Sequence, residues 1–395
     1  MHTRHTLLAA SFGLALAALA IMPAAAPALV GPINPPAGPV TSTAKPLTEV
    51  EPRIAINATN TPGDADSVYR ITQPGSYYLT GNIAGVAGKS GIEIAVGRVT
   101  IDLKGFHMQG VAGSLAGITS GQSDIRISNG LVTNWGVEGI NLTSGSVSPN
   151  TVENVNVAAN AGSGIRIPGG TVRNCILSGN GVHGIFGATV VQGCTAHNNT
   201  GIGIQANSGA VVQGCLARDN DDDGIEASNG STVTDCTARN NGGYGIIAFG
   251  SSVVSRCSST FNTVGGINGQ QATTILDCNA SDNDGYGIIV QGQCYVRGNT
   301  CHGNGGAGIY VSSVTGTQVE GNNMTNNARG LQVTGTNCVV IRNTASGNTV
   351  WNWDIDANNV VGPILDRTAV VSGSINGNSA PSSLGSTDTN ANFTY

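Results

Sequence analysis

Charged and aromatic residues are scarce in this sequence. Of its 395 residues, 10% are Asp, Glu, Lys or Arg, and 4% are Phe, Trp or Tyr. With 17 Lys and Arg against 23 Asp and Glu, the chain has no basic patch that could neutralise a row of phosphates. We therefore expect no nucleic-acid partner.

Residues that favour helices are also few. Leu, Glu and Lys are outnumbered by Gly, Val, Thr and Asn, and Gly alone contributes 58 residues. These glycines lack the period of three that a collagen helix requires, and a hydrophobic share of 39% is too high for a disordered chain. The composition favours short strands joined by tight turns.

The N-terminal 26 residues have the three parts of a secretory signal. Arg4 precedes an apolar run from Leu7 to Ile21, and small residues at 24–28 offer a cleavage site. The alternative, a membrane anchor, needs about 20 apolar residues, and this run is shorter and ends before Pro23. We expect removal of residues 1–26, a Pro-rich linker at 27–52, no membrane span, and a secreted, periplasmic or cell-surface location.

Three residue markers recur through the middle of the chain with a shared period of about 21 residues. They are a Gly-Ile or Gly-Leu pair, an Asn, and a Cys five residues before that Asn, whose place Asn takes in the last repeats. The pairs end at Ile118, Ile140, Ile165, Ile185, Ile204, Ile225, Ile246, Ile267, Ile288, Ile309 and Leu331. The Asn marker falls at Asn160, Asn180, Asn199, Asn220, Asn241, Asn262, Asn283, Asn304, Asn327 and Asn348. The Cys marker falls at Cys175, Cys194, Cys215, Cys236, Cys257 and Cys278, followed by Asn299, Asn322 and Asn343.

One repeat, GIEASNGSTVTDCTARNNGGY from Gly224 to Tyr244, contains three strand-like segments separated by Gly and Asn. At about 3.3 Å per residue, such a repeat is about 70 Å long, enough to wind once around a narrow triangular core. Successive coils would then pair in parallel, about 4.8 Å apart and with a right-handed turn. The sequence therefore predicts an all-β fold, a right-handed parallel β-helix of about 11–12 coils with three sheets. The side chains expected inside are Ile225, Ala227, Val233, Cys236 and Ala238.

The Asn and Cys markers predict two internal ladders. Asn at an inside corner can bond the turn's backbone and the Asn of the next coil. The Cys row could instead form disulfides, but stacked residues keep their Cβ atoms about 4.8 Å apart, whereas a disulfide prefers about 3.8 Å. We expect free, buried thiols, and no zinc site, because the cysteines lack a Cys/His partner set.

The ends of a β-helix expose unpaired strand edges, which must be covered. We expect residues 53–98 to form an N-terminal cap with the first strands, 99–350 the β-helix repeats, and 351–395 a C-terminal cap and tail. Trp351 and Trp353 are expected to pack in that cap rather than to form a sugar-binding platform.

The recurring pattern GI…V(x)₂C/N…N over residues 99–348 is accompanied by the leader segments PGSYYLTGNI and VTIDLKGF and the closing segments NNVVGPI and ANFTY. Together they resemble exported bacterial right-handed parallel β-helix repeat proteins of the pectate-lyase-like superfamily. The resemblance implies the fold but no single activity, since relatives include pectate lyases, polygalacturonases, alginate lyases, mannuronan epimerases and phage tailspikes. The relatives' Gly-His-Gly, Arg-x-Lys and Asp-Pro-His motifs are absent from this sequence.

The residue after each Gly-Ile pair is expected to point outward from one sheet. This row comprises Asn141, Arg166, Phe186, Gln205, Glu226, Ile247, Asn268, Ile289, Tyr310 and Gln332. It is mixed in character and holds one carboxylate, whereas a hydrolase would need two placed together.

An acidic turn precedes Glu226 and is the best candidate for a reactive site. One interpretation makes Asp221, Asp222, Asp223 and Glu226 acid–base residues, or Asp219, Asp221 and Asp223 ligands of Ca²⁺, the one cofactor that this sequence suggests. The alternative, which we favour, is a solvated turn whose carboxylates bond backbone N–H groups.

Two further features weigh against catalysis. His183, His197 and His302 lie in or near turns, where a surface role is expected more than that of a base. Most repeats keep 19–22 residues, which leaves no insertions to wall a cleft. We expect a protein that binds or organises extracellular polysaccharide or serves as a structural surface module. The alternative is a polysaccharide lyase, hydrolase or epimerase acting on an acidic glycan.

Overall fold

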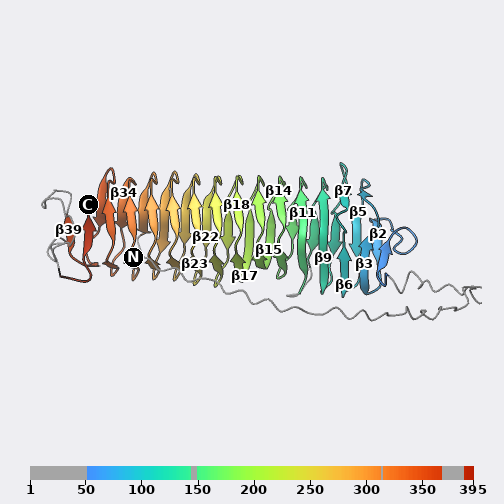
Figure 1. Ribbon diagram of the computed structural model, residues 1–395, viewed down its shortest axis with the longest axis horizontal. Helices are drawn as coiled ribbons and strands as arrows, with labels where there is room; N and C mark the ends of the chain where they lie inside the picture. The colour runs from blue at the N-terminus through green and yellow to red at the C-terminus, as the bar shows by residue number, and fades with distance from the viewer. Residues whose placement is uncertain (1–50, 144–148, 313–314, 367–386) are drawn as a thin grey trace, which may run out of the picture. The chain divides into compact units, whose positions relative to one another are not determined.

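The computed structural model describes residues 51–143, 149–312, 315–366 and 387–395 (Figure 1). The expected signal at 1–26 and nearly all of the linker lie outside these residues. Every regular element in the described part is a β-strand, and every pairing between named strands is parallel. No helix there is long and apolar enough to cross a membrane. The strands wind as a right-handed parallel β-helix, as the sequence predicts.

The strands form three columns, which we name the Ile, Val and Ala sheets after their main inward residue. The Ile sheet consists of β2 (Ser67–Ile71), β5 (Ser90–Ile94), β8 (Ile118–Ser120), β10 (Ile140–Leu142), β12 (Ile165–Arg166), β15 (Ile185–Gln192), β17 (Ile204–Gln213), β19 (Ile225–Ala227), β22 (Tyr244–Ala248), β25 (Gly265–Gly269), β28 (Tyr286–Gln291), β31 (Ala307–Ser312), β34 (Arg329–Val333) and β37 (Trp351–Ile355). These 14 strands correspond to 14 coils. The count exceeds the expected 11–12 because residues 67–94 and 351–355 add coils at the two ends.

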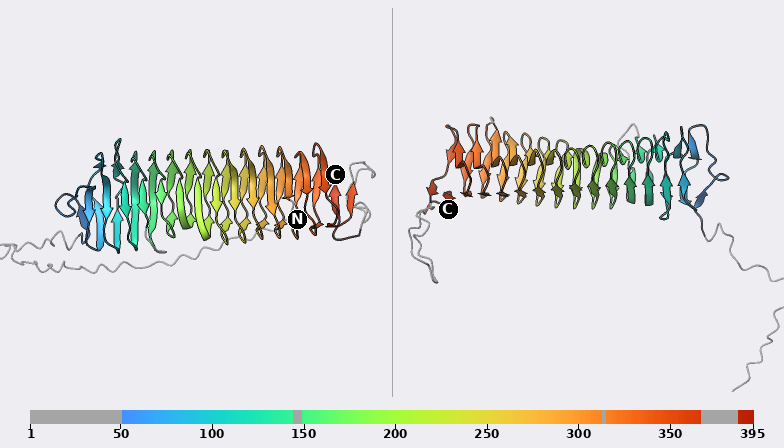
Figure 2. Two further views of the ribbon diagram at one scale, coloured as in Figure 1. Left: turned by 180° about the vertical axis from the view of Figure 1, so that it is seen from behind. Right: turned by 90° about the horizontal axis from the view of Figure 1, so that it is seen from above.

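The Val sheet consists of β1 (Ile54–Ile56), β3 (Gly75–Leu79), β6 (Val99–Asp102), β9 (Ile125–Thr133), β11 (Thr151–Ala158), β13 (Thr171–Arg173), the ends of β15 and β17, β20 (Thr232–Thr234), β23 (Val253–Ser255), β26 (Thr274–Leu276), β29 (Tyr295–Arg297), β32 (Gln318–Glu320), β35 (Val339–Ile341) and β38 (Val360–Val361). The Ala sheet consists of β4 (Ile83–Ala84), β7 (His107–Gln109), the ends of β9 and β11, β14 (Ile176–Ser178), β16 (Thr195–His197), β18 (Leu216–Arg218), β21 (Thr237–Arg239), β24 (Ser258–Thr260), β27 (Asn279–Ser281), β30 (Thr300–His302), β33 (Asn323–Thr325), β36 (Thr344–Ser346), β40 (Asn392–Thr394) and β39 (Ile364–Asp366). Two strands bend from the Ile to the Val sheet and two from the Val to the Ala sheet, so all three are joined. Figure 2 shows the stacked strands from two further sides.

The core is a set of residue columns that run through the inside of the coils. In the coil that starts at Gly224, the five side chains predicted to point inward are each at most 1% exposed. Register pairs Ile204 with Ile225 and Ile225 with Ile246, so identical side chains stack directly. Because each coil buries its apolar side chains against its neighbours, stability belongs to the array rather than to any one coil.

The Asn marker forms the predicted ladder. From Asn160 to Asn348, each side-chain amide donates to Oδ1 of the next marker Asn, and Asn352 accepts from the last. A typical member, Asn241, also donates to the carbonyl of Ala217 in the preceding coil. The ladder thus satisfies polar groups that a buried corner would otherwise leave without partners.

All nine cysteines are buried free thiols. In the column from Cys175 to Cys278, each thiol contacts two backbone carbonyl oxygens at 3.1–3.8 Å. Above Cys278 the column continues as a second Asn ladder through Asn299, Asn322 and Asn343, which ends on Asn392. That last bond joins residues 49 apart and attaches the C-terminal strand to the final coils.

The Gly of each Gly-Ile pair is required by the close approach of successive coils. A Cβ at Gly224 would lie 2.6 Å from the carbonyl oxygen of Gly245 and 2.7 Å from Nδ2 of Asn241. Any larger residue there would push the coils or the ladder apart.

At the C-terminal end the two tryptophans differ. Trp353 packs against the core, and its indole N–H donates to Oγ1 of Thr394 at 2.8 Å. Trp351 leaves 56% of its surface exposed and carries the Arg329 guanidinium over its ring. The expected tail between 367 and 386 lies outside the described residues.

Candidate functional site

The acidic turn joins β18 to β19. Its carboxylates lie in two separate regions, one at a corner pocket and one beside the Ile sheet. Asn220, in the middle of the turn, points inward as a member of the Asn ladder. Asp219 and Asp221 lie on one side of it and line a corner pocket. Asp223 lies on the other side, at the entrance to the Ile sheet, where its nearest charges are Asp222 and Glu226.

The corner pocket has a volume of about 510 Å³. Its lining residues are Asp219, Asn220, Asp221, Asn240, Asn241, Gly242, Phe261 and Thr263. Asp219 already pairs with Arg218 and accepts a hydrogen bond from Asn240 at 3.2 Å. Partial burial opposes these contacts, but the net effect is to lower the pKa of Asp219. Its carboxylate is therefore held as an anion by its neighbours.

The proposed Ca²⁺ ligands Asp219, Asp221 and Asp223 do not converge in this arrangement. Among the described residues, no group of three or more His, Cys, Asp or Glu side chains is placed to hold a metal ion. Asp221 and Asp222 are exposed. Ca²⁺ binding at this turn stays a prediction from the sequence.

Asp223 differs from the other members of the turn because it is buried, with 8% exposure. Loss of solvation, helped by the negative charges of Asp222 and Glu226, raises the pKa of Asp223 to about 6, although the backbone N–H of Tyr244 donates to its Oδ1 at 2.6 Å. A carboxyl group with such a pKa exchanges its proton close to neutral pH, which suits acid–base chemistry.

The contribution of Asp223 to the free energy of unfolding is expected to fall as the pH rises. Because the pKa of Asp223 is raised in the folded state, its contribution is fully present below about pH 4, the unfolded pKa, and is lost as the pH rises through about 6. We expect Asp223→Asn, which keeps an oxygen for the Tyr244 N–H, to stabilise the protein at pH 7 by roughly 1 kcal/mol. Guanidinium unfolding of both proteins from pH 4 to 8 measures this. A difference between them that does not change with pH would contradict the assignment.

His183 lies two coils before Asp223, at the same position relative to the Ile sheet. Burial lowers the pKa of His183, against the opposite influence of Glu226 and Asp222. Its Nδ1 accepts the backbone N–H of Ile202 at 3.0 Å, which leaves the proton of the neutral ring on Nε2. The histidine is thus half-buried and fixed in position, not a free surface side chain.

Two members of the outward row, Arg166 and Phe186, form a stack with the neighbouring ring of His183. The His183 ring stacks on Phe186 at 5.5 Å, and the Arg166 guanidinium lies 4.8 Å from the centre of the Phe186 ring. Strand register then places Gln205 and Glu226 in line with Phe186, and the Gln205 amide donates to Glu226 at 2.8 Å. The outward row predicted from the sequence is therefore confirmed in its register.

Two amide oxygens of this row, Oε1 of Gln205 and Oδ1 of Asn268, are buried and have no hydrogen-bond partner among the described residues. Buried acceptors are normally satisfied, so these two atoms are exceptions, and as buried atoms they are closed to an outside donor in this conformation. Further along, Tyr286 and Tyr310 stack with ring centres 4.8 Å apart. The outer face of the Ile sheet thus carries aromatic rings, amides and charged side chains along the row and its flank.

Sequence reasoning identified the outward row but missed its flank. His183, Asp223, Tyr244 and Tyr286 each stand two residues before a marker Ile, and the Gly bend turns them toward the same face. The signal was available, because these residues share the period of the marker. The turn's carboxylates, in contrast, were grouped by closeness in sequence, which the inward Asn220 interrupts.

Residues 116–264 and 262–378 match the family model described as the right handed beta helix region. The chain therefore belongs to this family of right-handed β-helix proteins. No curated protein sequence matches it.

Solved structures similar to this chain include enzymes that act on polysaccharides. The A-module of a mannuronan C-5 epimerase from Azotobacter vinelandii is 16% identical, covers 73% of this chain and 90% of its own, and has a TM-score of 0.48. A periplasmic alginate epimerase is 16% identical, with coverage of 77% and 79% and a TM-score of 0.42. The pectate lyase Pel9A is 19% identical, with coverage of 69% and 72% and a TM-score of 0.30. At such identities and scores, these likenesses do not bear on activity.

Proposed function

We propose that this protein is exported and binds a polysaccharide along the outer face of the Ile sheet. The observation that carries the proposal is the outward row, in which strand register sets aromatic rings and the amide side chains of Gln205 and Asn268 along one face. Rings offer apolar surface to the faces of sugars, and amides match sugar hydroxyls as both donors and acceptors. The signal pattern at residues 1–26 supports export.

The regular coils suit a polymer better than a small ligand. Strands about 4.8 Å apart set the side chains of the row in a straight line with fixed spacing. An extended polymer could lie along that line and contact several coils at once, so that weak contacts add through multivalency. A flat face of this kind binds without enclosing the ligand, whereas catalysis favours a concave site that excludes water.

The test is binding of the full chain to acidic and neutral polysaccharides by calorimetry. We expect Phe186→Ala to weaken binding about tenfold or more, because it removes the ring between Arg166 and His183. A matched control is Phe261→Asn, which removes an exposed ring from the corner pocket at a left-handed position that Asn tolerates. Absence of binding to every glycan, or equal binding by wild type and Phe186→Ala, would overturn the proposal.

A second candidate function is a polysaccharide lyase, hydrolase or epimerase acting on an acidic glycan. It is favoured by one observation: half-buried His183 and buried Asp223 share a face with the cation Arg166, and the pKa of Asp223 is raised to about 6. Assays for unsaturated products and new reducing ends on pectate and alginate, with and without Ca²⁺, test it. Activity that His183→Ala and Asp223→Ala abolish would establish catalysis, whereas a lack of turnover, or activity that both variants retain, would exclude this site.

A further inference from the structure

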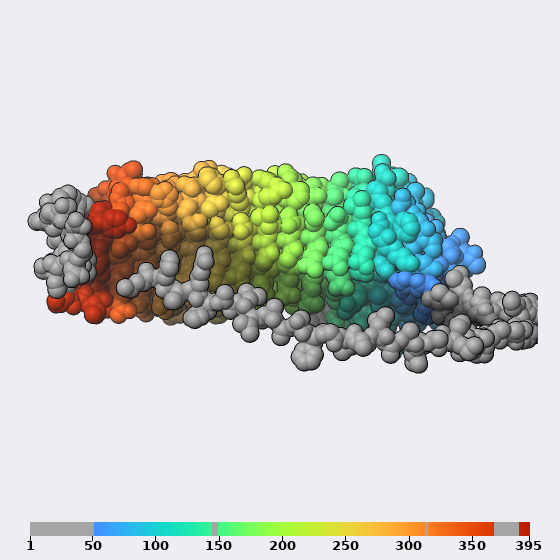
Figure 3. Space-filling view, viewed as in Figure 1, coloured from blue at the N-terminus to red at the C-terminus, as the bar shows by residue number. Residues whose placement is uncertain are grey.

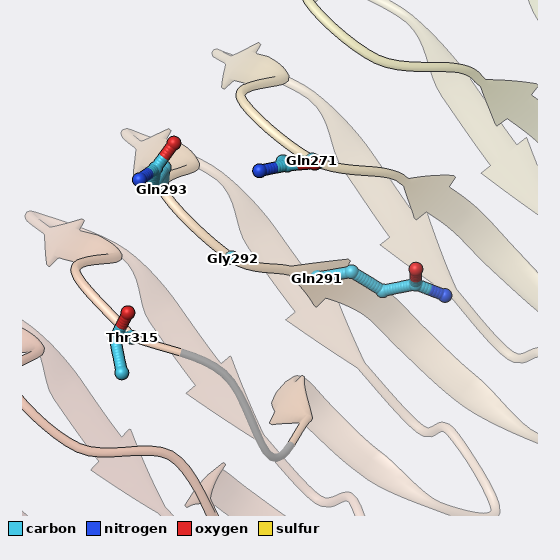
Figure 4. A pocket seen from close by; sticks show the side chains of 5 residues that line it. All are labelled: Gln271, Gln291, Gly292, Gln293 and Thr315. Atoms are coloured by element: carbon cyan, nitrogen blue, oxygen red, sulfur yellow. The ribbon is translucent and has the colours of Figure 1, made fainter.

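A second recess lies where the Ile sheet turns toward the Val sheet. It has a volume of about 330 Å³ and is lined by Gln271, Gln291, Gly292, Gln293 and Thr315 (Figure 4). We call these five residues the amide notch. They come from three successive coils near the C-terminal end of the stack, in the orange region of Figure 3.

The notch exists because a glycine stands between two larger residues in the column. Ser251 donates to the carbonyl of Gln271, Ala272 to that of Gly292, and Gln293 to that of Thr315, which places these carbonyl residues at equivalent positions of successive coils. The side chains of Gln271 and Thr315 are therefore two rungs apart, about 10 Å, with no side chain between them. The backbone of Gly292 forms the floor of the gap.

The chemistry of the notch is polar and uncharged. Gln271, Gln291, Gln293 and Thr315 are exposed, and their side chains have no hydrogen-bond partner within the part of the chain that the structure describes. Each amide presents two donors and one acceptor oxygen, and the threonine hydroxyl can donate or accept. A carboxylate or phosphate ligand would call for Arg or Lys, and neither lines the notch.

Strand β28 connects the notch to an aromatic platform on the same face. Tyr286, stacked on Tyr310, stands at the start of β28, and Gln291 is its last residue. About 16 Å separates them along the strand, with Ile289 between. Next to Ile289 in the sheet lies Asn268, whose buried Oδ1 lacks a partner in the described residues. The aromatic platform and the amide notch are thus separated along strand β28, across the direction of the row, by about the length of a short oligosaccharide.

We infer that this region is a subsite for a neutral oligosaccharide, with one sugar ring against the Tyr286–Tyr310 pair and hydroxyl groups of another in the amide notch. The inference rests on the proposed function and adds the class of ligand to it. No Arg or Lys lines the notch, and the one cation beside the platform, Arg329 of β34, already pairs with Asp354 at 3.0 Å. We therefore expect neutral sugars rather than uronates at this end. The charged half of the face, around Arg166 and Glu226, is a separate region of the row.

The experiment compares neutral and uronate oligosaccharides, for example β-glucan, mannan and polygalacturonate fragments, by calorimetry on the full chain. We expect a neutral oligosaccharide to bind, and Gln271→Ala with Gln291→Ala to weaken its binding about tenfold, as the loss of two or more hydrogen bonds implies. Because both side chains are exposed, the thermal unfolding of the double variant should match that of wild type. Gln213→Ala, an exposed glutamine on the Val sheet, is the matched control.

The outcomes separate this inference from the proposed function. Binding of uronate chains alone, weakened by Phe186→Ala, would overturn the neutral subsite and leave the proposed function standing. Neutral binding that the glutamine substitutions do not affect would also overturn the subsite. Absence of binding to any glycan would overturn both.

Discussion

Replacement of Asn241 by leucine is expected to lower the free energy of unfolding by about 4 kcal/mol, because four buried hydrogen bonds depend on this one amide. Its Oδ1 accepts the backbone N–H and the Nδ2–H of Asn220, at 3.2 and 2.9 Å. Its Nδ2 donates to the Ala217 carbonyl at 3.2 Å and to Oδ1 of Asn262 at 3.0 Å. Leucine has a similar size but can make none of these bonds.

Denaturant unfolding followed by circular dichroism measures this effect. The matched control is Asn240→Gly, one residue earlier, where the side chain is exposed and the backbone is left-handed, a conformation that glycine adopts freely. We expect that control to change stability by less than about 1 kcal/mol. If the two variants were equally stable, the ladder could not be what holds this corner. If Asn241→Leu fails to fold, Asn241→Ser gives a milder test in the same direction.

The fold could be predicted in detail because each repeat places the same residue types at the same inward positions, so the pattern recurs in coil after coil. At the Ile and Cys markers, side chains that are each at most 3% exposed confirm the expectation from coil to coil. The Asn marker was assigned to a ladder for a similar reason, since a polar residue recurring in phase with apolar columns must satisfy buried backbone groups. Closure by Asn392 could not be predicted, because the period fades after residue 348 and the contact joins distant segments.

The candidate site was harder to predict because its parts do not follow the repeat. Asp223 differs from its neighbours because the next coil buries it, and the backbone N–H of Tyr244 in that coil donates to its carboxylate. No pattern within one repeat predicts that contact. The amide notch depends on the absence of a side chain at Gly292 between larger neighbours in adjacent coils. Such features appear only when coils are set in register.

The second prediction with a large expected effect concerns the chemical reactivity of the buried cysteines. Each of the nine cysteines exposes at most 3% of its surface. Hydrogen bonding within the column together with burial raises the pKa of Cys194, Cys215 and Cys236 to about 12. Hydrogen bonding within the column lowers the pKa of Cys175 and Cys278 instead, so ionisation does not protect every thiol. Burial denies a reagent access to all nine, and we expect native thiols to react at least about a thousandfold more slowly than unfolded ones.

Thiol labelling tests the central claim of stacked coils most directly. The reduced protein is treated with a small thiol reagent under native conditions and in guanidinium, and the modified cysteines are located by mass spectrometry. Stacked coils predict no rapid labelling in the native protein and labelling of all nine cysteines after unfolding. Rapid native labelling of several cysteines between 175 and 278 would place that column at the surface and contradict the account.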